Sequence, residues 1–88
     1  MTYTVYILRT SSNTLYTGQT NNLERRMKEH KAKTIKSSKY IRSFSSFELV
    51  CTEKFATRSE AMKRERQIKS WSKIRKEKLI KDSLSHRQ

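Results

Sequence analysis

Residues 15–30, LYTGQTNNLERRMKEH, carry the pattern that decides the fold, because they join the end of a hairpin to the start of a helix. They hold Gly18, the only glycine in the protein. We expect Gly18 to end a strand, at a point where the backbone adopts a positive φ or is approached closely. Asn21 followed by Glu24 resembles a capping box, which predicts that a helix begins at Asn21 or Asn22.

Two pairs of side chains on this helix are each one turn apart. Leu23 and Met27 should face a sheet, because an apolar pair at this spacing is typical of the packed side of a helix. Arg26 and His30 lie on the neighbouring stripe. We expect that stripe to meet Tyr16 at one site.

Two stretches before this helix predict the strands of a hairpin, residues 2–8 and 14–17, with a polar turn between them. Alternation in the first strand separates its apolar side chains into two sets, Tyr3, Val5 and Ile7 on one face and Tyr6 and Leu8 on the other. Because both faces are apolar, we expect this strand at the centre of the sheet.

A third strand is predicted over residues 47–55, FELVCTEKF. By alternation, Phe47, Leu49 and Cys51 should point the same way. Cys51 is the only cysteine, so the chain forms no intramolecular disulfide and no multi-cysteine zinc site. We interpret it as a buried strand thiol.

A second capping box, Thr57 to Glu60, predicts a helix that runs to about Trp71. The inner stripe of this helix contains Ala61, Ile68 and Trp71.

Glu65 falls on the same inner stripe. A lone carboxylate in such a position costs several kcal/mol, so it needs an arginine or a bound cation as its partner. In the alternative interpretation, Glu65 lies at the rim of the stripe and pairs with Arg66 or Lys69.

Residues 31–46 are basic and rich in serine, and we interpret them as a loop that forms a candidate contact surface for nucleic acid. The alternative is a loop whose few apolar residues only pack its base. Residues 72–83 predict a last, very basic helix, and residues 84–88 a flexible tail. We therefore expect a single domain over residues 1–83.

The formal net charge of +13 on 88 residues indicates a polyanionic partner, with nucleic acid as the leading candidate. A membrane surface is the rival, but no apolar run is long enough to span a bilayer, and no basic helix has bulky apolar residues on its opposite side. The N-terminal residues do not resemble a secretory signal, so we expect a cytoplasmic protein.

The order of five residue types resembles that of the GIY-YIG endonuclease superfamily. Its paired tyrosine motif, and the arginine, histidine and glutamate that follow, correspond to Tyr6, Tyr16, Arg26, His30 and Glu65. The resemblance covers about residues 3–80 and is closest to small stand-alone bacterial members. It implies an α+β fold with a small three-stranded antiparallel sheet flanked by helices. The chain departs from the family pattern in its first triplet, Thr4-Val5-Tyr6, which lacks the glycine, and it has no clear equivalent of a late asparagine found in some members.

The resemblance implies a metal-dependent endonuclease. Glu65 would hold one divalent cation, Mg²⁺ with Mn²⁺ as a substitute, and Arg26 would grip the scissile phosphate. Tyr6 would be the general base if nearby cations lower its pKa, while Tyr16 would orient the water or a phosphate oxygen. His30 could serve as the base instead, or hold a tyrosine by a hydrogen bond.

Further basic residues should contact the phosphates of the substrate, without reading its sequence. We expect these to include Lys36, Lys39, Arg42, Lys63, Arg64, Lys73, Arg75 and Lys76. Trp71 could stack on a base, but core packing is favoured.

We expect the substrate to be DNA, with a role in repair or in processing structured DNA, and the protein to be a monomer or weak dimer. The alternative function is a non-catalytic nucleic-acid-binding module that retains the fold. A third possibility, a basic component of a ribonucleoprotein, explains the charge but not the five spaced residues.

Overall fold

The computed structural model describes residues 2–32 and 46–85, and its sheet has the expected three antiparallel strands. The strand β1 (Tyr3–Thr10) lies at the centre, between β2 (Leu15–Thr20) and β3 (Phe47–Phe55). Both predicted pairings are antiparallel. The α+β fold and the central position of the first strand are confirmed.

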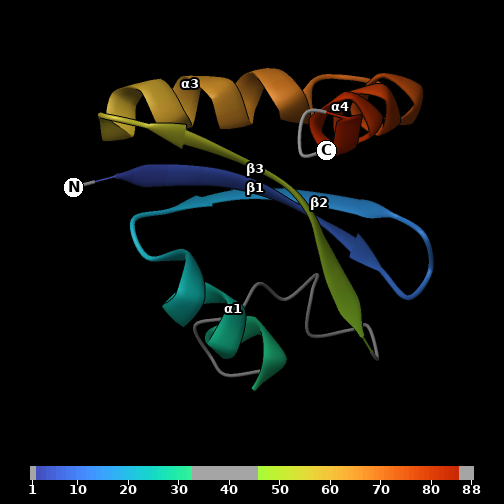
Figure 1. Cartoon of the computed structure of the whole chain (residues 1–88), viewed down its shortest axis with the longest axis horizontal. Coiled ribbons are helices and arrows are strands. Elements are labelled where there is room, and N and C mark those ends of the chain that lie inside the picture. Colours follow the sequence, from blue (N-terminus) through green and yellow to red (C-terminus); the bar gives the residue numbers. More distant parts are fainter. Residues whose placement is uncertain (1, 33–45, 86–88) are drawn as a thin grey trace.

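Helices cover both faces of this sheet (Figure 1). Helix α1 (Leu23–Lys31) lies on one face, and α3 (Arg58–Lys69) and α4 (Lys73–Ser85) lie on the other. None of the helices in the described ranges is long and apolar enough to cross a membrane. Residues 86–88 lie outside the described residues, and the predicted tail from residue 84 stays a prediction.

The alternation of β1 divides the core into two layers, as predicted. Val5 and Ile7 are both 1% exposed and pack against α3 and α4, in a cluster that also contains Cys51, Ala61, Ile68 and Ile80. Tyr6 and Leu8 face the other way, toward a cluster of partly buried residues, Tyr16, Leu23, Met27 and Phe47. Because Tyr6 belongs to this second layer, its hydroxyl faces the side of the sheet covered by α1.

Gly18 lies inside β2 rather than at its end, so the predicted end of the strand was wrong. Its φ is not positive, and it pairs directly with Tyr6 across the ladder. The second reason considered for this glycine, a close approach, is confirmed. A Cβ built on Gly18 would lie 2.5 Å from Oη and 2.6 Å from Cζ of Tyr6.

The alternation of β3 is interrupted at Val50. Consecutive residues of β1 pair with Leu49 and Cys51, which leaves Val50 as an extra residue in a β-bulge. Cys51 therefore packs in the layer of α3 and α4, whereas Phe47 packs in the layer of α1. The prediction that these side chains share one face was wrong, because the bulge reverses the alternation.

Both helix starts are stabilised by a side-chain cap. At α1 the N-cap is Asn22, whose side chain accepts a hydrogen bond from the backbone of Arg25 at 3.0 Å. At α3 the predicted box is confirmed, because Thr57 accepts from the backbone N–H of Glu60 and donates to its carboxylate. Helix α3 ends at Lys69, two residues before the predicted end.

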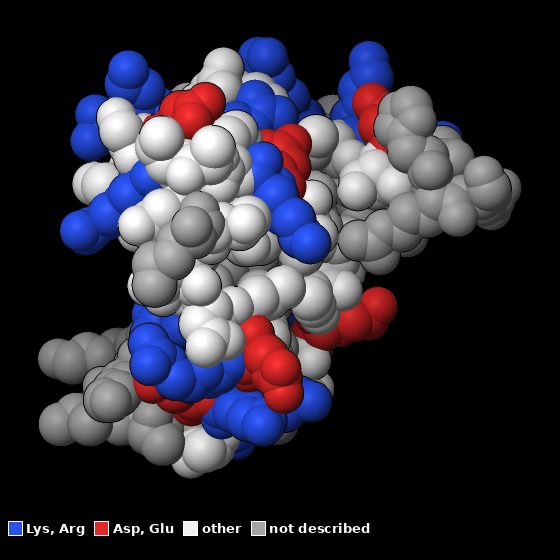
Figure 2. Space-filling view, turned by 60° about the vertical axis from the view of Figure 1, so that its left-hand side comes forward, with Lys and Arg blue, Asp and Glu red and all other residues white. Residues whose placement is uncertain are grey.

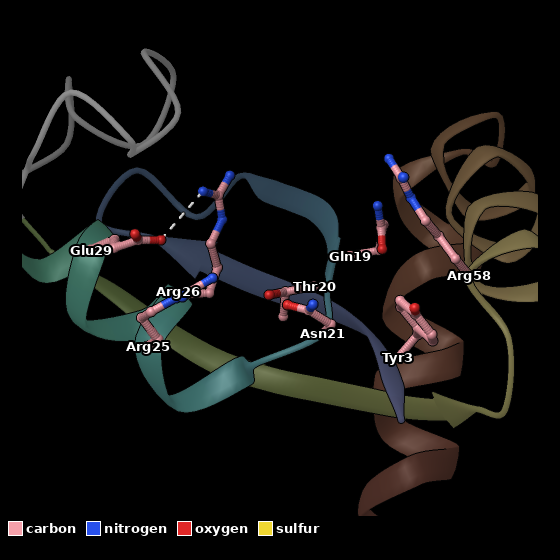
Figure 3. Close-up of a pocket in the computed structure, with 8 residues that line it drawn as sticks. All are labelled: Tyr3, Gln19, Thr20, Asn21, Arg25, Arg26, Glu29 and Arg58. Carbon is pink, nitrogen blue, oxygen red and sulfur yellow. Dashed lines mark ion pairs between the residues drawn. The ribbon is translucent and has the colours of Figure 1, made fainter. Parts of the chain in front are cut away.

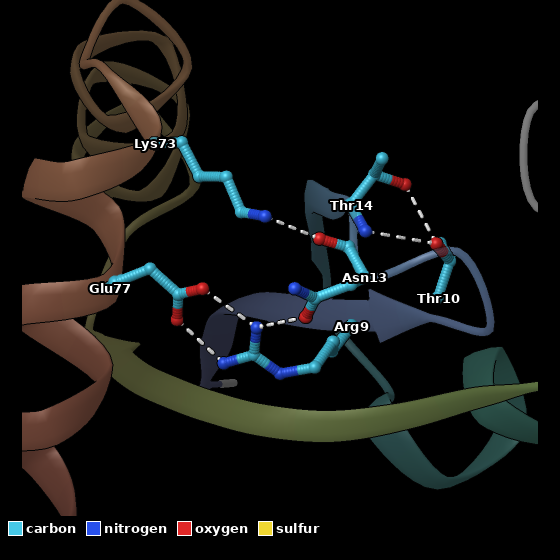
Figure 4. A network of polar contacts seen from close by, with 6 residues as sticks. All are labelled: Arg9, Thr10, Asn13, Thr14, Lys73 and Glu77. Carbon is cyan, nitrogen blue, oxygen red and sulfur yellow. Dashed lines mark hydrogen bonds and ion pairs between the residues drawn. The ribbon is translucent and has the colours of Figure 1, made fainter.

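A network of polar contacts attaches α4 to the hairpin (Figure 4). Arg9 donates to both carboxylate oxygens of Glu77, at 2.7 and 2.6 Å. Lys73 donates to the carbonyl oxygen of Asn13 at 2.7 Å, and Asn13 occupies the turn with φ of 61°. Asparagine is among the residues that adopt this left-handed conformation most readily. The hydrogen bonds from Arg9 lower the pKa of Glu77.

Replacing Glu77 by Gln should lower the free energy of unfolding by about 1 kcal/mol at neutral pH, since the pair is charge-assisted but partly exposed. The lowered pKa means that the contribution of the pair is complete above the ordinary glutamate value of 4.5 and is lost as pH falls through the folded value. The difference between the two proteins should therefore shrink in acid.

Denaturant unfolding at several pH values checks this prediction. Glu24→Gln is the matched control, because Glu24 and Lys28 are 82% and 76% exposed and their pair should contribute close to nothing. Equal effects of the two substitutions, or a difference that persists in acid, would contradict it.

Candidate active site

The Tyr6 hydroxyl is the meeting point of two predicted site residues. The side chain is 1% exposed and projects from the central strand toward α1. Its Oη lies 3.1 Å from Nε2 of His30 and accepts a hydrogen bond from Nε of Arg26 at 3.3 Å. Because Arg26 uses the oxygen as an acceptor, the tyrosine proton is available to Nε2 when His30 carries its own proton on Nδ1.

Tyr16 joins the same cluster from β2. It pairs with Leu8 in the ladder, two residues from Gly18, so it lies on the same face as Tyr6. Its ring centroid is 6.4 Å from that of Tyr6 and 5.9 Å from that of His30. Tyr16 and Gly18 are two residues apart and therefore lie on the same face of β2. The Tyr16 ring lies beside Tyr6, and Gly18, which has no side chain, leaves room for the Tyr6 ring.

Helix α1 positions Arg26 and His30 one turn apart, as predicted. His30 is 1% exposed and lies edge-on to the rings of Tyr6, Tyr16 and Phe47, with centroid distances of 5.9 to 6.0 Å. Arg26 is 27% exposed and also pairs with Glu29 at 3.6 Å. The imidazole is therefore enclosed, and the guanidinium faces both the cluster and solvent.

Burial raises the pKa of Tyr6 to about 12, and this effect exceeds the opposing hydrogen bond from Arg26. Arg26 lowers the pKa of Tyr6 as the sequence led us to expect, but burial outweighs this effect, so the net shift has the opposite direction. Burial and the neighbouring Arg26 lower the pKa of His30. At neutral pH the pair consists of a protonated phenol and a neutral imidazole, which is the arrangement needed for His30 to accept a proton.

Glu65 lies on α3, on the opposite face of the sheet from α1. Its side chain is 22% exposed and accepts a hydrogen bond from Lys69 at 3.2 Å, which is the rim arrangement considered as the alternative. Its charge is one of the influences that raise the pKa of Tyr6. The structure thus joins Tyr6, Tyr16, Arg26 and His30 by contact and places Glu65 within electrostatic range.

Glu65 is the predicted site residue that could hold a cation, through a single carboxylate. Within residues 2–32 and 46–85 there is no group of three His, Cys, Asp or Glu side chains that could form a metal cage. Mg²⁺ is commonly held by one or two carboxylates together with waters and substrate phosphates. The Lys69 side chain is 52% exposed and can leave Glu65 when a cation binds.

The predicted phosphate contacts have different surroundings. Lys36, Lys39 and Arg42 lie outside the described residues. Lys63 is exposed and Lys76 half-buried. The other three already have partners, because Arg64 donates two hydrogen bonds to Glu53, Lys73 contacts the hairpin, and Arg75 lies 4.2 Å from the Trp71 ring.

Trp71 packs against the core layer of α3 and α4, which agrees with the favoured interpretation. Arg64 lies over its ring at 5.0 Å and Arg75 at 4.2 Å.

Basic side chains flank one face of the molecule (Figure 2). Lys and Arg gather on the part that carries α3 and on the part that carries α1, with a band of uncharged surface between them. Two arginines were missed by the sequence reasoning, Arg25 beside Arg26 and Arg58 at the start of α3. Both line a cavity at the edge of β2 (Figure 3). Only their places, next to Arg26 and inside the second capping box, could have drawn attention to them.

Comparison with known proteins agrees with this arrangement. Residues 2–79 match the model of the GIY-YIG catalytic domain. The UPF0213 protein NP_0776A of Natronomonas pharaonis is 49% identical over 78 residues, which cover 89% of each chain. The UPF0213 protein OB0043 of Oceanobacillus iheyensis is 47% identical over 76 residues, which cover 86% of each chain.

A solved structure is also similar, the solution NMR structure of the UPF0213 protein BH0048 from Bacillus halodurans. The two folds superpose with a TM-score of 0.60 at 38% sequence identity, covering 92% of this chain and 84% of the other. These relatives contain little beyond the matched domain. The family resemblance inferred from the sequence is confirmed, and the chain belongs to the GIY-YIG catalytic domain family, a family of nuclease domains.

Proposed function

We propose that this protein is a metal-dependent endonuclease that hydrolyses phosphodiester bonds in DNA. The observation that carries the proposal is the contact of one buried hydroxyl, that of Tyr6, with both His30 and Arg26. An enclosed phenol–imidazole pair beside a guanidinium offers a proton acceptor next to a phosphate-binding group. Family membership supports nuclease chemistry at this place.

Each side chain has a distinct role in the proposal. Arg26 binds the scissile phosphate and stabilises the charge that develops on it. The neutral imidazole of His30 takes a proton through the Tyr6 hydroxyl, which in turn accepts the proton of the attacking water. Tyr16 orients the water or a phosphate oxygen. The order of proton transfers follows from the direction of the two pKa shifts.

Glu65 is the residue that would hold the divalent cation, Mg²⁺ or in its place Mn²⁺. When bound, the cation supplies positive charge for the phosphate and the leaving oxygen. Its displacement of Lys69 from Glu65 would remove an ion pair that is only partly buried, so the cost is small.

The charge of the protein supports a nucleic-acid substrate, and the proposal takes it to be structured DNA processed in repair. A cytoplasmic location and a monomeric or weakly dimeric state stay predictions. The alternative, a non-catalytic binding module, is one outcome of the experiment that follows.

Glu65→Gln should abolish cleavage, with a loss of about 10²-fold or more, while nucleic-acid binding changes little. Glutamine keeps the size of the side chain but is a much weaker ligand for Mg²⁺. Glu60→Gln on the same helix is the matched control, since glutamine also suits this capping position. The assay compares labelled duplex, branched and single-stranded DNA and RNA, with Mg²⁺, Mn²⁺ or EDTA.

Cutting that survives Glu65→Gln would place the activity elsewhere or in a contaminant. Binding without cutting by the unmodified protein on every substrate would support the non-catalytic module.

A further inference from the structure

A polar cavity of about 400 Å³ lies at the end of β2, beside the Tyr6–His30 contact but separate from it. Figure 3 shows its walls, with Arg25 and Arg26 from α1 on one side and Arg58 from α3 on the other. Gln19, near the end of β2, and Asn21, just after it, lie between them. The volume lies within the range of small-ligand sites, roughly 300–1,000 Å³.

The charge of this cavity favours an anion. Three guanidinium groups line it, against a single carboxylate, Glu29, which pairs with Arg26. Neither Arg25 nor Arg58 forms an ion pair with another described residue, whereas Arg9 and Arg64 are each held by a carboxylate. Two guanidinium groups whose charge no described carboxylate balances thus line one hollow, and a bound phosphate would balance that charge.

Arg26 connects the cavity with the cluster. Its Nε donates to Tyr6 at 3.3 Å, while the same side chain lines the cavity. A strand whose scissile phosphate lies at Arg26 therefore has a neighbouring nucleotide at the mouth of the cavity. The amides of Gln19 and Asn21 can both donate and accept hydrogen bonds there, which suits a sugar or a base edge.

We infer that this cavity binds the nucleotide next to the cleaved bond, with Arg25 and Arg58 on its phosphate and Gln19 and Asn21 on its sugar or base. The substrate strand then crosses the edge of β2 from α1 to α3. This inference rests on the proposed function, because it takes the scissile phosphate to lie at Arg26.

The test measures binding of a short fluorescein-labelled single strand by anisotropy, without divalent metal and over a range of salt. The variant Arg25→Gln/Arg58→Gln is compared with Lys28→Gln/Arg66→Gln, which removes the same charge from exposed positions of the same two helices. The first should weaken binding about tenfold or more and lower the salt slope by about 0.7, because both arginines contact one phosphate. The second should weaken binding less than about threefold.

Strand addition should also shift the side-chain amide NMR signals of Gln19 and Asn21 in the unmodified protein and in the control variant, but not in Arg25→Gln/Arg58→Gln. Equal losses of affinity in the two double variants, or unmoved amide signals, would overturn the inference. Because no metal is present, the result does not depend on cleavage. Selective loss of binding in a protein that never cuts refutes the proposed nuclease alone, and equal losses in a protein that cuts refute the cavity alone.

Discussion

Tyr6→Phe protein is expected to bind nucleic acid nearly as well as the unmodified protein and to cleave it about 10²–10³ times more slowly. Phenylalanine keeps the ring in its position against Gly18. It removes only the hydroxyl oxygen, which contacts both His30 and Arg26. Single-turnover cleavage and anisotropy measure the two quantities on the same labelled strand. Cleavage within about threefold of the unmodified rate would exclude the hydroxyl from the reaction.

The pH dependence of the rate identifies the proton acceptor. The pKa of His30 is lowered from 6.5, and its neutral form is the acceptor, so the rate should fall only as pH drops through that lowered value. Above it the rate should be flat, because the pKa of Tyr6, about 12, lies far from neutral pH. A rate that instead rises across the alkaline range would assign the base to a tyrosine.

Gly18→Ala is expected to destabilise the protein by about 1–3 kcal/mol and to disrupt the cluster. The new Cβ would lie 2.5 Å from Oη and 2.6 Å from Cζ of Tyr6, closer than these atoms can approach. The ring is 1% exposed and has no open side into which it can move. Denaturant unfolding gives the stability, and the cleavage rate shows whether the hydroxyl keeps its place.

A double-mutant cycle separates this clash from any destabilising effect of alanine in β2 that does not involve Tyr6. In Tyr6→Leu protein the ring is absent, and alanine suits a strand better than glycine does. Gly18→Ala should then be neutral or slightly stabilising, with a coupling energy of about 1–3 kcal/mol between the two sites. An equal cost in both proteins would show that the ring is not what requires the glycine.

Local patterns in the sequence were sufficient for most of the fold. Successive apolar residues of β1 point to opposite faces of the sheet without interruption, so the two faces of this strand could be predicted. Helices α1 and α3 both begin at a side-chain cap, so their first residues could be predicted as well. The bulge at Val50 could not, because the apolar residues Leu49, Val50 and Cys51 follow one another and fit either face, and the interruption arises only in pairing with β1. The continuation of β2 through Gly18 likewise depends on a contact between strands.

The sequence was sufficient to predict which residues form the candidate site. It was not sufficient to predict the pKa values of their side chains. Helical spacing places Arg26 and His30 on one side of α1, and the family resemblance adds Tyr16 to the set. The pKa of Tyr6 depends on how deeply its ring is buried, which the sequence does not state. Arg58 is distant from Arg25 in sequence, and only the packing of α3 on the sheet shows that both line one cavity.

In the function proposed above, the chain cuts nucleic acid through the Tyr6 cluster with a cation at Glu65. Its most direct test is a single-turnover experiment in which excess protein is bound to end-labelled DNA and Mg²⁺ is added last. We expect no product before the addition, cleavage after it, and an immediate stop with EDTA. Bound DNA that stays intact after Mg²⁺ and Mn²⁺, across duplex, branched and single-stranded forms, would contradict it.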